Sequence, residues 1–393
     1  MKEGWRWYGS FDRISLPEIA QSGATDIVSS LHEIPYGEVW PRDVVAKMRA
    51  TIEAEGFNWP IVESLPIHEQ IKRGEGDLGQ FFENYRQSMA NLAAEGVKVI
   101  CYNFMPLLDW TRTDLTAPVA RGGSCLRFDA GKMAALEIYM LKRPGAEDDY
   151  GPEALEAARI WFDGSSEADR DLLMQSVMAG LPGAYDRYDI EGLRKGLELY
   201  EDIDKDALRA NYKRFLDEVI PAAEELGISL AVHPDDPPRD ILGLPRIVST
   251  GDDIAWVLGA HESRNNGLTL CSGSLGANPA NDIPAIAERF ADKIHFAHLR
   301  NVRKFPDGSF EEAAHLEGDT DMAKLVAVLL TEEQRRKDEG RDDCDIVLRP
   351  DHGHELLSDA DRKTHPGYPM IGRLRGLAEL RGVIAGIKHE RQN

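Results

Sequence analysis

Residues 98–104 read KVICYNF, in which the uninterrupted apolar run VICY is followed by the polar Asn103. Two further segments have the same form, 229–235 (SLAVHPD) and 345–352 (DIVLRPDH). Continuous apolar runs of this kind are typical of strands buried on both faces, as in parallel sheets that are covered by helices. These three segments therefore predict central parallel strands of an α/β protein.

Five more segments complete a set of eight candidate strands. They are 5–9 (WRWYG), 25–31 (TDIVSSL), 58–65 (NWPIVESL), 267–273 (GLTLCSG) and 294–301 (IHFAHLRN). Helical periodicity lies between them, in 78–95, 207–226, 284–291, 321–331 and 373–387. Strands that alternate with helices indicate a parallel sheet, and eight such units close into a TIM (β/α)8 barrel. The alternative is a doubly wound open sheet, but neither G-x-G-x-x-G after the first strand nor G-x-x-x-x-G-K-[ST] occurs.

The regular spacing of the candidate strands breaks once, between the fourth and the fifth. Residues 105–200 carry helical patterns there, among them PEALEAARIWF and DLLMQSVMAG. We expect this segment to be a helical insertion at the C-terminal face of the barrel, where barrel active sites lie. No Pro-rich or Ser-rich linker divides the chain, so a single domain over 1–393 is predicted.

The charge balance limits the classes of partner. The 393 residues contain 46 Lys and Arg against 68 Asp and Glu, a formal net charge of −22. Such a surface repels nucleic-acid phosphates and anionic membranes, so neither is an expected partner. The first residues lack the apolar stretch of a signal peptide and no membrane-spanning run is visible, which predicts a cytoplasmic protein. The four cysteines form no C-x-x-C pair, so any role for one of them is individual.

Four consecutive candidate strands end in residues that bind divalent metals. They are His233, Cys271, His298 and Asp351. Each alone has an ordinary explanation, a core cysteine or a turn-capping aspartate for example. In a barrel, however, these strand ends converge on one mouth, so the set predicts a metal site. Mixed N, S and O ligation leaves Zn(II), Fe(II), Mn(II) and Co(II) open.

Further polar groups lie near the same strand ends. Arg349 precedes Asp351 by two residues, and on a regular strand the two side chains share a face. Its guanidinium could bind a substrate carboxylate, or pair with an acid of the same rim. His352 and Tyr368 are candidates for proton transfer. Asn103 and His32 are candidates for binding substrate hydroxyls.

Long motifs of this chain resemble those of the mannonate dehydratase family. They are WRWYGSFDRISL, TDIVSSLHEIPYGEVW, VICYNFMPLLDWTRTDL, LAVHPDDPP, LCSGSLGANPAND, FAHLRNV, LRPDHGHE and PGYPMIGRLRGLAEL. The resemblance implies a TIM barrel and a lyase that converts D-mannonate to 2-dehydro-3-deoxy-D-gluconate in hexuronate (glucuronate) catabolism. It implies Mn(II) or Fe(II) as cofactor and His233, Cys271, His298 and Asp351 as ligands. It also implies that Arg349, His352 and Tyr368 serve the anionic sugar acid and its protons.

The nearest alternative is a metal-dependent sugar isomerase or epimerase of the same barrel class. Those sites usually rely on several carboxylates, and the thiolate of Cys271 argues against that pattern. A barrel endonuclease is disfavoured by the acidic composition. A structural zinc in a binding protein is the non-catalytic alternative. A homo-oligomer is expected, of undetermined subunit number.

Overall fold

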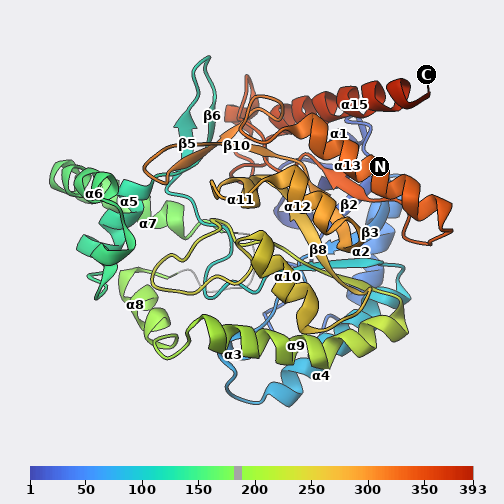
Figure 1. Cartoon of the computed structure of the whole chain (residues 1–393), viewed down its shortest axis with the longest axis horizontal. Helices are drawn as coiled ribbons and strands as arrows, with labels where there is room; N and C mark the ends of the chain where they lie inside the picture. The colour runs from blue at the N-terminus through green and yellow to red at the C-terminus, as the bar shows by residue number, and fades with distance from the viewer. Residues whose placement is uncertain (181–187, 393) are drawn as a thin grey trace.

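The computed structural model describes residues 1–180 and 188–392, and its centre is a closed barrel of eight parallel strands (Figure 1). Around the barrel the order is β1-β12-β9-β8-β7-β4-β3-β2. The strands are β1 (Lys2–Arg6), β2 (Asp26–Ser29), β3 (Asn58–Glu63), β4 (Val99–Tyr102), β7 (Ser229–Val232), β8 (Asn266–Cys271), β9 (Ile294–His298) and β12 (Val347–Arg349). Every one of them overlaps a candidate strand of the sequence, so the predicted barrel is confirmed.

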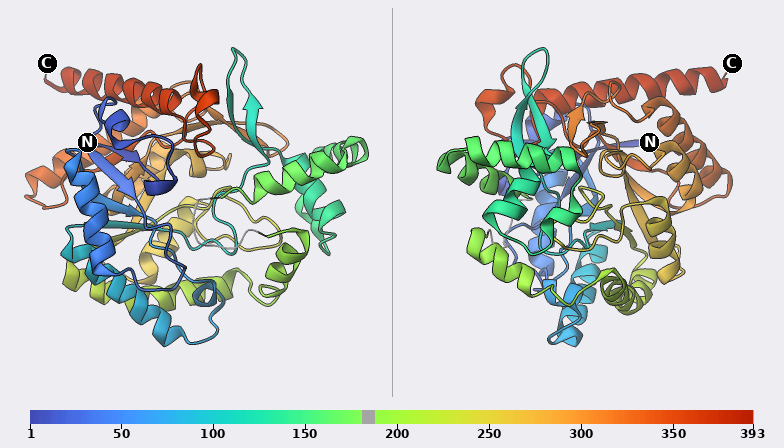
Figure 2. Two further views of the ribbon diagram at one scale, coloured as in Figure 1. Left: turned by 180° about the vertical axis from the view of Figure 1, so that it is seen from behind. Right: turned by 60° about the vertical axis from the view of Figure 1, so that its left-hand side comes forward.

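Helices cover the outside of the barrel (Figure 2). The longer ones are α2 (Arg42–Ala54), α4 (Leu78–Ala94), α9 (Lys205–Leu226), α10 (Gly251–Ala260), α13 (Met322–Asp338) and α15 (Met370–Gln392). Shorter ones are η1 (Gly9–Phe11), α1 (Leu16–Ala20), α3 (Glu69–Arg73), α11 (Ser272–Gly276), α12 (Ile283–Arg289), η4 (Ala291–Lys293) and α14 (Asp359–Arg362). Capping sets the ends of α9: Asp204 accepts from the Ala207 N–H at 2.8 Å, and Gly227 adopts a left-handed φ of 65° after the last turn.

Two apolar regions build the barrel. The main core lies between the strands and the outer helices and includes Leu230, Leu268 and Phe215. A smaller cluster lies inside the barrel and consists of Val28, Ile61, Cys101, Phe296 and Val347. Both faces of the strands are therefore buried, which explains why their sequences read as continuous apolar runs.

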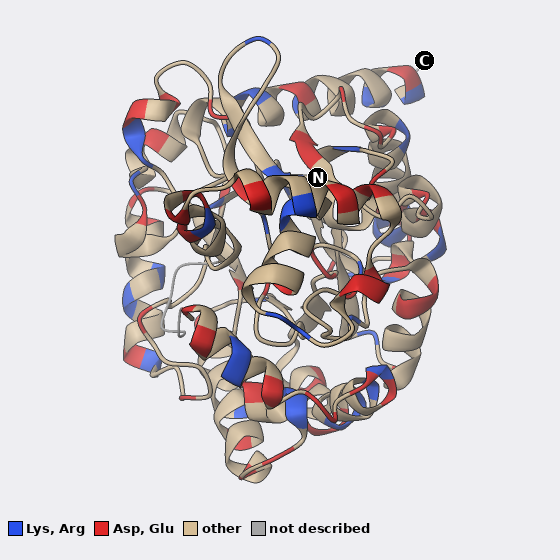
Figure 3. Ribbon diagram, turned by 90° about the vertical axis from the view of Figure 1, so that its left-hand side faces the viewer, with Lys and Arg blue, Asp and Glu red and all other residues tan. Residues whose placement is uncertain are grey.

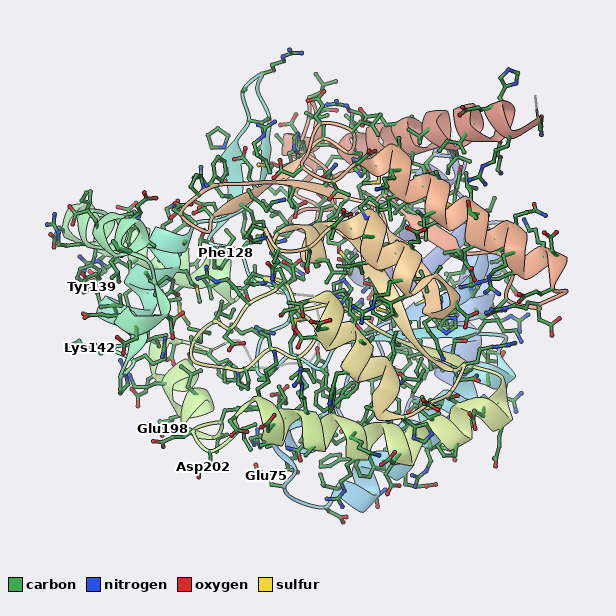
Figure 4. The ribbon with its side chains drawn as sticks, viewed as in Figure 1. Glu75, Phe128, Tyr139, Lys142, Glu198 and Asp202 are labelled. Carbon is green, nitrogen blue, oxygen red and sulfur yellow. The ribbon has the colours of Figure 1, made fainter. Side chains whose placement is uncertain are left out.

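The segment between β4 and β7 contains more than the predicted helices. Its helices are α5 (Ala130–Ala135), the π turn η2 (Leu136–Met140), η3 (Ala146–Asp149), α6 (Pro152–Gly164), α7 (Glu167–Val177) and α8 (Ile190–Glu198). It begins, however, with a hairpin of β5 (Asp114–Pro118) and β6 (Ser124–Phe128), which the sequence analysis did not predict. Figure 4 labels Tyr139, Lys142 and Glu198 at the edge of this segment, away from the barrel. Residues 181–187 of the expected insertion lie outside the described residues.

The hairpin belongs to a second, four-stranded sheet with the order β10-β11-β6-β5. Its other strands, β10 (Asn301–Lys304) and β11 (Phe310–Ala313), follow β9 directly in the chain. The rings of Phe128 and Phe310 stack across this sheet at 5.4 Å. The single domain over 1–393 stays a prediction.

Acidic and basic residues are interspersed along the outer helices (Figure 3). Many pair within one helix or between neighbouring helices, as Arg335 does with Glu332 at 2.8 Å and Arg86 with Glu218 at 3.0 Å. Within residues 1–180 and 188–392, no helix has the length and apolar character that a membrane span requires.

Candidate active site

Three of the four predicted metal ligands meet at the carboxyl ends of their strands. His233 follows β7, Cys271 ends β8 and His298 ends β9. One ligand atom from each lies within 4.8 Å of the others. The strand register explains this, because Cys271 pairs with His298, and His298 with Arg349 on β12. The residues therefore stand at one level of the barrel.

The fourth predicted ligand, Asp351, lies beside two of these three. Its Oδ2 atom is 3.6 Å from Cys271 Sγ and 3.8 Å from His298 Nδ1. Asp351 has a left-handed backbone with φ of 63°, a conformation that costs a non-glycine residue energy and is kept where surrounding contacts impose it. Two arginines supply such contacts: Arg300 Nε lies 2.7 Å from Asp351 Oδ2 and Arg349 Nη1 lies 2.8 Å from Oδ1.

Each histidine has one ring nitrogen that faces the centre of this group. The carbonyl of Pro234 can only accept, so the contact of 2.7 Å to His233 Nδ1 places the ring proton there. Glu63 Oε2 lies 3.5 Å from His298 Nε2, so its negative charge favours a proton on that nitrogen. The remaining nitrogens, His233 Nε2 and His298 Nδ1, face each other at 3.2 Å. In the neutral form of each ring these two nitrogens, beside the sulfur of Cys271 and the Asp351 carboxylate, fit a bound cation, and the outer acceptors orient each imidazole.

The electrostatics of the group favour the ligand form of the cysteine. Burial alone would raise the pKa of the Cys271 thiol, but Arg300 and hydrogen bonds from His233 and His298 outweigh it and hold that pKa well below its usual value. The thiolate is the form that binds metals. Burial lowers and the Cys271 contact raises the pKa of His233, with a net result of about 9. The negative charges of Cys271 and Asp351 therefore favour a cation here, which is a proton on His233 in the metal-free protein and would be a metal ion in its place once metal binds.

A small cavity that opens to solvent lies over these residues. It is lined by Glu63, Asn103, Met105, Trp110, His233, Asp236, Arg300, Arg349, Asp351, His352 and Tyr368. The structure thus brings Asn103, Arg349, His352 and Tyr368 to the predicted ligands. His32 is not among the lining residues described; its Nε2 lies 3.2 Å from Arg6 Nη2, and its ring lies 5.5 Å from that of Tyr8.

The two candidates for proton transfer are neighbours in the cavity wall. The rings of His352 and Tyr368 meet edge to face at 4.9 Å. Burial raises the pKa of Tyr368, while the charge of Arg349 opposes that rise. The phenol therefore keeps its proton at neutral pH and can donate it. Arg349 already pairs with two acids, since its Nη2 also donates to Glu63 Oε1 at 2.8 Å.

The family model described as D-mannonate dehydratase (UxuA) matches residues 1–393. The chain belongs to this family. It is similar to the mannonate dehydratase of Chromohalobacter salexigens, with 52% identity over 389 residues that cover 99% of each chain. The mannonate dehydratase of Marinomonas sp. is 48% identical over 389 residues, again 99% of each chain. The crystal structure of mannonate dehydratase from Streptococcus suis serotype 2 has a TM-score of 0.79 and 31% identity, and covers 100% of this chain and 95% of that one.

The mannonate dehydratase fold of this chain contains site residues that the sequence analysis missed. They are Glu63, Trp110, Arg112, Asp236, Arg300 and Glu312. A signal existed for Glu63, because it ends a barrel strand in the same way as Cys271 and His298. Glu312 gave no such signal, because β11 is not a barrel strand.

Proposed function

We propose that this chain dehydrates D-mannonate to 2-dehydro-3-deoxy-D-gluconate, as a hydro-lyase of hexuronate (glucuronate) catabolism. The observation that carries the proposal is the family match over residues 1–393. The convergence of His233, Cys271 and His298 under an open cavity supports it, because removal of a proton next to a carboxylate needs a cation nearby. Family membership also favours dehydration over the alternative, a sugar isomerase or epimerase.

The cofactor we propose is one divalent metal, Mn(II) or Fe(II), with Zn(II) and Co(II) as alternatives. His233, Cys271, His298 and Asp351 would hold it, and their donor atoms suit first-row transition metals. When bound, it supplies Lewis-acid stabilisation of the negative charge that develops on the substrate carboxylate.

The side chains of the cavity account for the proton transfers. His352 takes the proton from C2 of the sugar acid, and Tyr368 donates its phenolic proton to the hydroxyl that leaves C3 as water. The electron pair of the C2–H bond forms the C2–C3 double bond of an enol, which tautomerises to the 2-keto product. The rings of His352 and Tyr368 are in edge-to-face contact at 4.9 Å, and two neighbouring side chains suit proton transfers at the neighbouring carbons C2 and C3. Arg349 supplies positive charge beside the substrate carboxylate.

Three companion statements stay predictions. Asn103, in the cavity wall, and His32, whose ring lies 5.5 Å from that of Tyr8, are the residues proposed to bind substrate hydroxyls. A homo-oligomer is expected on general grounds. A cytoplasmic location and the absence of nucleic-acid and membrane partners follow from the sequence argument above and are tested by fractionation.

Metal removal tests the proposed function directly. We expect protein treated with a chelator to lose turnover of D-mannonate, and Mn(II) or Fe(II) added under reducing, anaerobic conditions to restore it. The product should be lighter than the substrate by one water in mass spectrometry. A product of unchanged mass would support an isomerase or epimerase instead. Folded protein that turns over no D-mannonate with any of the four metals would contradict the proposal.

A further inference from the structure

Glu312 is a buried carboxylate that the proposed reaction does not use. It lies on β11, in the second sheet, and is 3% exposed. Its Oε1 atom has three partners: His352 Nδ1 at 3.0 Å, Arg300 Nη1 at 2.7 Å and Arg112 Nη2 at 3.1 Å. The contact with His352 connects the second sheet to a proposed proton-transfer residue.

We propose that Glu312 is a positioning residue for the dehydration: its carboxylate fixes the ring orientation and the tautomer of His352, so that Nε2 is the atom that exchanges protons with the substrate. This inference rests on the proposed function, in which His352 takes the C2 proton. Glu312 itself does not line the cavity among the described residues.

The donor and acceptor capacities of Glu312 and His352 determine which nitrogen of His352 carries the proton. Burial would raise the pKa of Glu312, but Arg300, His352 and Arg112 hold that pKa well below its usual range, so the group is a carboxylate. A carboxylate only accepts, so His352 Nδ1 must carry a proton in their contact at 3.0 Å. The neutral ring then has its lone pair on Nε2. An outer carboxylate that orients a functional histidine in this way is a recurrent device in enzyme sites.

Two arginines hold the carboxylate in place. Arg112 Nη1 donates to Asp236 Oδ1 at 2.7 Å, and Arg300 Nη2 donates to Asp236 Oδ2 at 2.5 Å. Asp236 therefore fixes both guanidinium groups that bind Glu312. The two arginines face Glu312 and Asp236, and Arg300 also contacts a third carboxylate, that of Asp351. Glu312 thus has little freedom to follow a moving imidazole.

The backbone around His352 is attached to the same sheet. His354 Nε2 lies 2.9 Å from the carbonyl oxygen of Glu312. Ser124 of β6 exchanges backbone hydrogen bonds with Glu355, at 3.1 Å and 2.8 Å. Both ends of the contact between Glu312 and His352 are therefore held by one sheet. This arrangement is what a positioning role requires.

The test separates positioning of His352 from simple stabilisation of the sheet. In Glu312→Gln the amide can donate or accept, so it no longer selects the tautomer. We expect kcat for D-mannonate to fall by about 10- to 100-fold with KM and metal content little changed. In the His352→Asn background the same substitution should have almost no further effect, because residues that act as a unit are not additive. The low rates that remain in the His352→Asn variants are measured in assays with enzyme in excess over D-mannonate.

Glu332→Gln is the matched control. Glu332 is also a buried carboxylate between two arginines, with Arg336 at 2.6 Å and Arg335 at 2.8 Å, but it lies on α13 and not at the mouth. It should leave kcat unchanged. Glu312→Asp keeps the charge while it shortens the reach to His352, and serves as a second variant if Glu312→Gln does not fold. We expect it to lower kcat with metal content retained.

Either of two results would overturn the inference. One is a kcat of Glu312→Gln, or of Glu312→Asp, no lower than that of Glu332→Gln. The other is an equal fall of kcat in the native and His352→Asn backgrounds. If the native protein dehydrates D-mannonate but the effects of Glu312→Gln and His352→Asn are additive, the proposed function stays intact and only the role of Glu312 is refuted. Native protein without dehydratase activity would refute the proposed function itself.

Discussion

Cys271→Ala is expected to lose its bound divalent metal and to lower kcat for D-mannonate by about 1,000-fold. Cys271 Sγ lies among the histidine nitrogens and Asp351, and alanine removes this thiolate ligand. The neutral hydroxyl of Ser274, 3.1 Å from Sγ, does not replace its negative charge. A cation that stabilises developing charge contributes several kcal/mol, and about 1.4 kcal/mol corresponds to tenfold in rate. Metal content by atomic spectroscopy and steady-state kinetics on the same sample provide the measurement.

Cys101→Ala is the control for this variant. Cys101 is as fully buried as Cys271, but it belongs to the apolar cluster inside the barrel with Phe296 and Val347. It should keep its metal and lose only some stability, since a small cavity replaces the sulfur. Full metal content and full turnover in Cys271→Ala would show that the four-ligand proposal is wrong.

Tyr368→Phe is expected to lower kcat by about 100- to 10,000-fold while metal content and folding stay unchanged, the range that general acid catalysis spans. The substitution removes the phenolic hydroxyl, with its hydrogen bonds to Arg349 and Tyr8, and keeps the ring. The ring keeps its edge-to-face contacts with His352 at 4.9 Å and Tyr8 at 5.1 Å, and its place near Arg373. The rate of formation of the 2-keto product, measured in quenched assays, gives kcat, and metal analysis of the same samples gives the metal content.

Tyr212→Phe is the control for Tyr368→Phe, because it shows the effect of losing a buried tyrosine hydroxyl that is not the proposed proton donor. Tyr212 is fully buried and its hydroxyl lies 2.7 Å from that of Tyr102, between α9 and β4. Its loss should reduce stability without a change in kcat. A Tyr368→Phe protein with native kcat would exclude the phenol as the acid and leave that role to another group of the cavity.

Most of the barrel could be predicted because its strands are buried on both faces. That burial makes segments such as VICY and SLAV apolar throughout, and the strand ends then mark the mouth. His233, Cys271 and His298 were identified from this position alone, before any geometry. Strand alternation also explains why His295, three residues before His298, takes no part in this group: its Nε2 instead contacts the carbonyl of Arg264 at 2.9 Å.

The second sheet could not be predicted from local patterns. Its strands come from 114–128 and 301–313, and each is short and partly exposed. Their pairing depends on contacts between distant residues, such as Glu311 with Arg127. For the same reason Glu312 and Arg112 could not be assigned to the site, since their partners, His352 and Asp236 respectively, lie 40 and 124 positions away in the chain. Periodicity carries no information about such pairs.

The second sheet also limits how far this chemistry can be transplanted. A designer who grafted the four ligands with His352 and Tyr368 onto another eight-stranded barrel would copy six side chains, but not the carboxylates and guanidinium groups behind them. In this chain those groups are presented partly by β11 and by the segment before β5, which no minimal barrel possesses. Loops that are far apart in sequence therefore have to be redesigned together, and a recipient barrel needs an equivalent of this sheet before the graft can work.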